Sequence, residues 1–235
     1  AVQGLSTAAI AGLSSTQVLG LTTAQLAAWT TSVQIRALES ADLAQLSSAQ
    51  VKSLSSAQLG YLSSAQLAAL SGAATGVLGT NTIASLNSAD LAALTSAQVA
   101  GLSTAQLQAL SSAQVPGLGT EDIAALSSVQ IGALRTASLA GLSTDQIAAL
   151  SSTNVKGLSS AQLLALSSSQ IAALETDDFA QLSSAQLGAL SSKQGAGLTT
   201  AQLASLDSAE LSKLSTAAVQ GLSTAAIAGL SSTQV

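Results

Sequence analysis

Residues 62–70 read LSSAQLAAL, and variants of this phrase fill nearly the whole chain. With Leu5 as position 1 of the repeat, leucine returns at residues 13 and 21 and then at every eighth residue from 38 to 230, which gives 29 octads, the last one incomplete. One octad differs, because Trp29 stands in place of leucine and one extra residue, near Thr30, follows it. The chain is therefore a tandem array of eight-residue repeats.

Four positions of the octad are restricted in residue type. Position 6 is Leu, Ile, Val or Phe in 27 of the 29 octads, and position 3 is Ser or Thr in 28 of them. Position 5 is Gln, Asp or Glu in 22 octads, and position 8 is Ala, Gly or Ser in 23 of the 28 that reach it. At the two exceptions to position 6, Thr75 and Gly195, we expect local packing defects, bends or room for a partner's side chain.

An eight-residue period suits neither one long helix nor one long strand. At about 100° per residue, a continuous helix would advance each leucine by about 80°, so the leucines would spiral around its surface. In a strand, positions 1 and 6 have opposite parity and would face opposite sides of a sheet. The chain must therefore turn once per octad, as short helices in series or as a β-solenoid.

The phrase LSSAQL favours the helical alternative. Ser at position 2 is suited to be the N-cap, and Gln at position 5 is then the N3 partner of a capping box. Positions 1 and 6 become the two halves of a hydrophobic staple. Alanine, leucine and glutamine are also strong helix formers, whereas aromatic residues make up only 1% of the chain.

The distribution of charge favours helices as well. All eleven acidic residues fall at position 2, 4 or 5, and four of the six bases fall at position 7 or 8. A helix dipole selects this arrangement, because acids stabilise its start and bases its end. The acids are Glu39, Asp42, Asp90, Glu121, Asp122, Asp145, Glu175, Asp177, Asp178, Asp207 and Glu210, and the four bases are Arg36, Lys52, Lys156 and Lys213.

We predict an all-α solenoid or superhelix with one very short, capped helix per octad. A β-solenoid stays open as the alternative, because the hydroxyl is stricter at position 3 than at position 2, where Glu39, Arg135 and Glu175 cannot act as ordinary caps. In a helical array, the position 3 residue is either the N-cap in some octads or the donor to a backbone carbonyl across the turn, and in a β-solenoid the position 3 hydroxyls would form a ladder.

Residues 1–235 are predicted to form a single continuous array. Residues 1–18 are identical to residues 218–235, so we expect the sequence to be a window of a longer tandem array with a 217-residue unit. A lone octad is too short to fold by itself, so its stability must come from stacking on neighbours.

The predicted packing places positions 1 and 6 inward and the Ser, Thr and Gln side chains in water. Trp29, Tyr61 and Phe179 are the bulky exceptions. Trp29 either fills the space disturbed by the extra residue or is a docking point for another strand. Pro116 lacks the amide that a longer helix would need, so the helix around it must be very short.

The composition argues against an enzyme. The chain has no Cys, His or Met, so its serines have no histidine as general base. GLGTE at residues 117–121 lacks the lysine of a P-loop. We therefore predict no catalytic residue, no cofactor and no small-molecule substrate.

Metal, nucleic-acid and membrane sites are not predicted either. The acid cluster Glu175, Asp177 and Asp178 has the ligand type that Ca²⁺ takes, but its spacing matches no calcium loop, and the same holds for Glu121 and Asp122. With six bases and a net charge of −5, nothing would hold a phosphate backbone. The longest apolar runs are also far shorter than the roughly 20 residues of a membrane span.

The phrases LSTAQLQAL (102–110) and LSSAQLAAL (62–70) resemble the low-complexity octads of very large repetitive bacterial proteins, often described as adhesin-like or haemagglutinin-like surface proteins. This resemblance implies a secreted or surface-tethered protein whose repeats form a stalk, filament or matrix. We expect an extracellular or cell-surface structural array that self-associates along or between fibres. The alternative is a solenoid that presents regular hydroxyls and binds ice or glycans.

Overall fold

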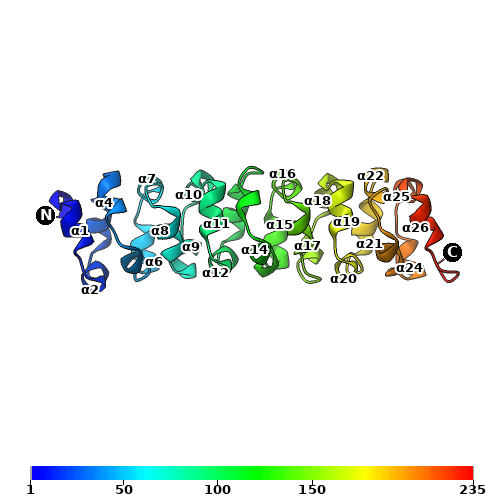
Figure 1. Cartoon of the computed structure of the whole chain (residues 1–235), viewed down its shortest axis with the longest axis horizontal. Helices are drawn as coiled ribbons and strands as arrows, with labels where there is room; N and C mark the ends of the chain where they lie inside the picture. The colour runs from blue at the N-terminus through cyan, green and yellow to red at the C-terminus, as the bar shows by residue number, and fades with distance from the viewer. Residues whose placement is uncertain (1, 235) are drawn as a thin grey trace. The chain divides into compact units, whose positions relative to one another are not determined.

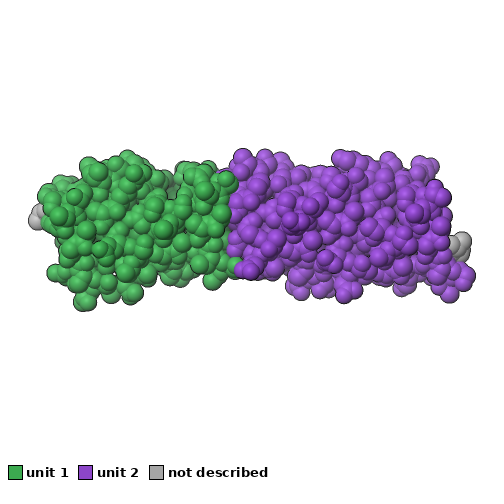
Figure 2. Space-filling model, viewed as in Figure 1, with its two compact units in different colours: residues 1–110 green, residues 111–235 purple. Residues whose placement is uncertain are grey.

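The computed structural model describes residues 2–234 and contains only short helices in that part of the chain. The predicted all-α solenoid is confirmed, and the alternative of a β-solenoid is not supported, since residues 2–234 include no strand. The structure divides into two compact units, Ala1–Leu110 and Ser111–Val235, which are coloured separately in Figure 2.

The first unit consists of one 3₁₀ helix and thirteen α-helices within its described residues, most of them five or six residues long. They are η1 (Val2–Gly4), α1 (Thr7–Ala11), α2 (Ser15–Leu19), α3 (Thr23–Ala27), α4 (Ser32–Arg36), α5 (Ser40–Leu43), α6 (Ser48–Lys52), α7 (Ser56–Leu59), α8 (Ser64–Ala69), α9 (Gly72–Gly76), α10 (Thr80–Ser85), α11 (Ser88–Ala93), α12 (Ser96–Ala100) and α13 (Thr104–Ala109).

The second unit repeats the pattern with two 3₁₀ helices among its α-helices. They are η2 (Val115–Gly117), α14 (Thr120–Ala125), α15 (Ser128–Ala133), α16 (Thr136–Ala140), α17 (Thr144–Ala148), η3 (Val155–Gly157), α18 (Ser160–Ala165), α19 (Ser168–Ala173), α20 (Thr176–Phe179), α21 (Ser184–Ala189), α22 (Ser192–Gly195), α23 (Thr200–Ala204), α24 (Ser208–Leu211), α25 (Thr216–Gly221) and α26 (Thr224–Ala228).

Each α-helix begins at position 3 of its octad, so the residue at position 2 is the N-cap. In α8, the Ser63 side chain accepts a hydrogen bond from the Gln66 amide at 3.3 Å, and the Ser63 amide donates to Gln66 Oε1 at 2.9 Å. The helix ends where Leu70 turns to extended backbone, with φ −62° and ψ 143°. The predicted capping box is confirmed, and position 3 is therefore not the cap.

The three charged N-caps that cannot act as ordinary caps make no capping hydrogen bond, as their residue types predict. Glu39, Arg135 and Glu175 make no side-chain cap hydrogen bond. Most of the other acids lie in the first turn of a helix, as Asp145 does in α17, and Arg36 and Lys52 lie in last turns. These placements agree with the predicted response to the helix dipole.

Helices three octads apart pack against each other, so one turn of the superhelix takes about three octads. In the first unit α3 packs on α6, α6 on α9 and α9 on α12, and in the second α17 packs on α19, α19 on α22 and α22 on α25. Figure 1 shows α7 and α10 along one side of the first unit and α9 and α12 along the opposite side, with α8 and α11 between them.

The core of each unit is built from positions 1 and 6, as predicted. Leu67 and Leu70 are 2% and 3% exposed, and most other octads bury the same pair. Trp29 and Phe179 are both 0% exposed. Trp29 therefore fills the interior at the irregular octad, and the alternative that it is a surface docking point is wrong.

Gly195 and Thr75 are not the packing defects that the sequence suggested. A Cβ atom on Gly195 would lie 2.1 Å from the Ala218 carbonyl oxygen, so the backbone of α25 occupies the space that an aliphatic side chain fills elsewhere. The Thr75 hydroxyl is buried and donates to the Ser71 carbonyl at 3.1 Å. No partner's side chain enters at either position, because protein atoms already fill both.

Pro116 lies in the 3₁₀ helix η2, where the regular α-helix of the octad is replaced by a tighter turn. The Gly117 amide donates to the Gln114 carbonyl at 2.9 Å, in the i to i+3 pattern of a 3₁₀ helix. The prediction that the helix around this proline must be very short is confirmed.

Candidate functional site

The glutamine at position 5 joins one turn of the superhelix to the turn before it. In α12, Gln98 Oε1 accepts the Thr95 amide at 2.8 Å, which completes the capping box of its own helix. Gln98 Nε2 donates to the carbonyls of Leu67 at 3.0 Å and Leu70 at 2.6 Å, where α8 ends. One amide group therefore caps the start of one helix and the end of another.

The same bridge recurs along both units. At the irregular octad, Gln58 Nε2 reaches the carbonyls of Leu26 at 3.0 Å and Trp29 at 2.7 Å, so the extra residue does not interrupt it. Further bridging glutamines, each of which donates to carbonyls 28 to 32 residues earlier, include Gln34, Gln50, Gln66, Gln106, Gln146, Gln162, Gln170, Gln186, Gln194, Gln202 and Gln234.

This arrangement corrects the expectation that the glutamines face water. Gln98 is 2% exposed and Gln202 is 1% exposed. An amide is tolerated in an apolar core because both of its ends are hydrogen-bonded, and an unpaired polar group there would cost about 1–3 kcal/mol. The buried glutamines therefore have a structural role, because they make hydrogen bonds between turns.

Asparagine performs the same role with a shorter reach. Asn154 Oδ1 accepts the Ser151 amide at 2.5 Å, and Nδ2 donates to Ile123 O at 3.2 Å and Leu126 O at 3.5 Å. The donor side is stretched because the side chain is one methylene shorter than glutamine. In this octad the α-helix is replaced by the 3₁₀ helix η3.

Carboxylates at position 5 accept a hydrogen bond from a serine hydroxyl of the preceding turn. Ser15 Oγ donates to Asp42 Oδ1 at 2.9 Å, and Ser64 Oγ donates to Asp90 Oδ1 at 2.9 Å. Both serines are at position 3. Asp42 is 3% exposed, and its Oδ2 atom is buried without a hydrogen-bond partner, because aspartate has no donor to replace the glutamine amide.

Position 3 hydroxyls also bond backbone carbonyls across the turn, which is one of the two roles the sequence left open. Ser160 Oγ donates to Ala185 O at 3.4 Å, and Thr200 Oγ1 donates to Ala225 O at 3.5 Å. The acceptor lies 25 residues later in both pairs. Contacts between turns therefore account for part of the selection for Ser and Thr at this position.

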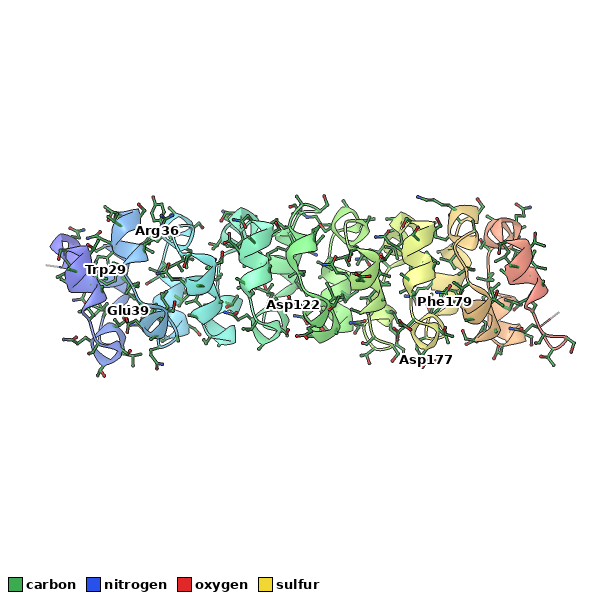
Figure 3. The ribbon with its side chains drawn as sticks, in the orientation of Figure 1. Trp29, Arg36, Glu39, Asp122, Asp177 and Phe179 are labelled. Atoms are coloured by element: carbon green, nitrogen blue, oxygen red, sulfur yellow. The ribbon has the colours of Figure 1, made fainter. Side chains whose placement is uncertain are left out.

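The acid cluster of α20 contains one buried carboxyl. Asp178 is 7% exposed, whereas Asp177 and Glu175 are exposed. Figure 3 shows Phe179 within the second unit and Asp177 at its outer margin. Burial, together with the negative charges of Glu175 and Asp177, raises the pKa of Asp178 above its ordinary value of 3.8. Among residues 2–234 no group of three or more acidic, His or Cys side chains is arranged to hold a metal ion.

Replacing Asp178 with asparagine is expected to stabilise the protein at neutral pH by on the order of 1 kcal/mol. Between pH 3.8 and the raised pKa, the folded state binds more protons at this carboxyl than the unfolded state, so the free energy of unfolding falls as pH rises. Below pH 3.8 the carboxyl is protonated in both states, and the advantage of the variant should disappear.

Urea titrations of both proteins from pH 3 to pH 8 measure this difference. The exposed Asp145 is the matched control, and its change to asparagine is expected to alter stability by less than about 0.5 kcal/mol. An advantage of Asp178→Asn that stays constant across the pH range would contradict the assignment.

The irregular octad opens two hollows beside Thr30. One is about 560 Å³ in volume and is lined by Ala27, Thr30, Lys52, Ser53, Leu54, Ser55, Ala57, Gln58 and Tyr61. The other, of about 470 Å³, is lined by Gln3, Leu5, Ser6, Thr7, Ala28, Thr30, Thr31, Val33 and Gln34. The octad pattern predicts no site here, although the extra residue near Thr30 marks the position in the sequence.

Cationic and aromatic side chains gather around the larger hollow. Lys52 and the half-buried Tyr61 line it. Arg36 Nε donates to the Tyr61 carbonyl at 3.0 Å, which fixes a second cation next to Tyr61. Figure 3 places Arg36 at the outer margin of the first unit and Trp29 deeper inside it. Lys52 therefore lines this hollow, whereas Arg36 contacts the backbone of Tyr61 from outside the lining.

The comparisons with known proteins agree with a repeat architecture. No helix in residues 2–234 has the length and apolar character needed to cross a membrane. No curated protein matches the chain. The ALTTAQ repeat family model matches residues 35–72, 83–120, 116–152, 147–176, 171–208 and 203–235, and residues 93–98 read ALTSAQ. Since these segments span most of the sequence, the chain belongs to the ALTTAQ repeat family.

Proposed function

We propose that the chain is the structural repeat region of an extracellular bacterial filament, stalk or matrix fibre. The observation that carries the proposal is the glutamine bridge, because inside each unit the same amide donor meets the same kind of carbonyl acceptors of the turn before it at most octads. An array joined in this way lengthens by adding identical turns. The stability of such an array comes from the same contact repeated along its length, and no single site is required for it.

The composition supports assembly outside the cell. Charged residues are 7% of the chain, so little electrostatic repulsion opposes self-association along or between fibres. The absence of Cys and Met removes the two easily oxidised sulfur side chains. The resemblance to adhesin-like repetitive proteins supports the same cell-surface or extracellular location.

A protein carrying several tandem copies of the 217-residue unit tests this proposal. We expect fibres by electron microscopy and a helix-rich circular dichroism spectrum from the same sample. Antibody labelling of intact, unpermeabilised cells tests the location, and we expect surface signal. A monodisperse globular particle from the tandem protein would overturn the fibre, and labelling only after permeabilisation would overturn the location.

A further inference from the structure

We propose that the hollow between Thr30, Lys52 and Tyr61 is a binding site for an acidic carbohydrate, with a uronate sugar as the chemical class. The hollow lies in the first unit, over α6 and α7 and beside the extra residue of the irregular octad. This inference adds a ligand site to the proposed fibre and does not depend on that function.

The walls of the hollow are set by how the extra residue is accommodated. Trp29 takes the place of the leucine and is 0% exposed, and its carbonyl accepts the Gln58 bridge at 2.7 Å. The interior therefore keeps its regular contacts, and Thr30 remains exposed at the surface. The extra residue therefore changes the surface and leaves the core unchanged. The helices that border the hollow are held in place by their core contacts.

The charge of the hollow selects an anion. Lys52 is exposed and lines the hollow, and none of the described residues that line it is acidic. Arg36 does not line the hollow, because its Nε donates to the backbone carbonyl of Tyr61 at 3.0 Å, so Lys52 supplies the positive charge of the lining. A carboxylate pairs with an ammonium or guanidinium through charge-assisted hydrogen bonds, which are about twice as strong as neutral ones.

The uncharged residues that line the hollow favour a sugar as the part of the ligand that bears the carboxylate. Thr30 and Ser55 contribute hydroxyl groups, which suit a ligand with many hydroxyls of its own, whereas the Ser53 hydroxyl donates to the Gln50 carbonyl at 2.7 Å. Tyr61 is half-buried and offers an aromatic surface with a polar tip. The volume of about 560 Å³ lies in the range of small-ligand sites and accommodates one or two sugar rings.

Titration with digalacturonate tests the site, with galactobiose as the neutral counterpart. Tyr61 is the only tyrosine of the chain, so its ring signals in the NMR spectrum report on the hollow without overlap from other tyrosines. We expect these signals to shift with digalacturonate, with at least about tenfold tighter binding than galactobiose at low salt. Raising the salt concentration should weaken the binding.

Three variants complete the test. Lys52→Ala should weaken digalacturonate binding about tenfold and leave the weak galactobiose binding unchanged, whereas Tyr61→Ala should weaken both. Lys193→Ala removes a lysine of the second unit that is also exposed, and it should change neither. Because Lys52 is exposed, its variant should fold normally, which circular dichroism checks. Equal binding of the two sugars, no shift at Tyr61, or unchanged binding by Lys52→Ala would overturn the proposal.

Discussion

Replacing Gln98 with glutamate is expected to lower the free energy of unfolding by about 3–5 kcal/mol at pH 7. The glutamate keeps an oxygen for the Thr95 amide, so the capping box survives. It loses the Nε2 donor and places a carboxylate against the carbonyls of Leu67 and Leu70, in a site that is 2% exposed. The substitution therefore removes the bridge between turns and buries an unpaired charge in its place, while the capping box of α12 is kept. Urea unfolding at pH 7 measures the loss.

Gln17 provides the matched control for this prediction. It has the same capping box, in which the Ser14 amide donates to Oε1 at 2.8 Å, but it is exposed in the 235-residue chain. Gln17→Glu should change stability by less than about 0.5 kcal/mol. If Gln98→Glu costs no more than Gln17→Glu, the bridge does not stabilise the array. At low pH, a protonated glutamate regains a donor, so the loss at position 98 should also become smaller.

Replacing Gly157 with alanine is expected to destabilise the protein by about 3 kcal/mol. A Cβ atom at this position would lie 1.8 Å from the Ser128 carbonyl oxygen and 2.5 Å from its carbonyl carbon. Both are backbone atoms, so no side-chain movement relieves the clash, and η3 must move away from α15. The sequence alone suggests that this substitution would stabilise the protein, because alanine is common at position 8 and is a better helix former than glycine.

Gly20→Ala is the control, since Gly20 is also at position 8. The nearest atom to its added Cβ would be the Gln17 carbonyl oxygen at 3.3 Å, within its own helix turn. Ala28, one octad later, already adopts nearly the same backbone angles. We expect Gly20→Ala to be neutral or stabilising by up to about 1 kcal/mol. Thermal unfolding of both variants measures the difference, and equal effects would contradict the close approach at Gly157.

The local structure of this protein could be predicted from its sequence, because it depends on residues within one octad. Ser63 and Gln66 are three residues apart, so their capping box is visible in the phrase LSSAQL. Likewise, the hydrophobic staple of positions 1 and 6 lies within one octad, so it can be predicted without the number of octads in a turn of the superhelix. These short-range devices decide between helix and strand.

The inter-turn contacts could not be predicted, because they depend on how many octads complete one turn. Gln98 meets Leu67 and Leu70 only because a turn takes about three octads, and nothing within an octad specifies that number. Without it, a repeated glutamine is indistinguishable from a surface residue. The hollow beside Thr30 was missed for a related reason, since Lys52 and Tyr61 reach it from the next turn.

The most direct test of the account measures which octads lie side by side. Spin labels would be placed on cysteines that replace Ser160 and, in separate proteins, Asp177, Ala185 or Lys193. Asp177, Ala185 and Lys193 are all exposed and all occupy position 4 of their octads. These octads lie two, three and four octads, respectively, after the octad of Ser160. Ser160 Oγ contacts only the Ala185 carbonyl among these, at 3.4 Å.

Electron paramagnetic resonance should therefore give the shortest interspin distance for the pair 160 and 185, shorter than for 160 and 177 although the sequence separation is greater. That minimum is the result expected if each turn takes three octads and rests on the one before it. An interspin distance that rises steadily from 177 through 185 to 193 would contradict the stacked superhelix and the glutamine bridges that depend on it.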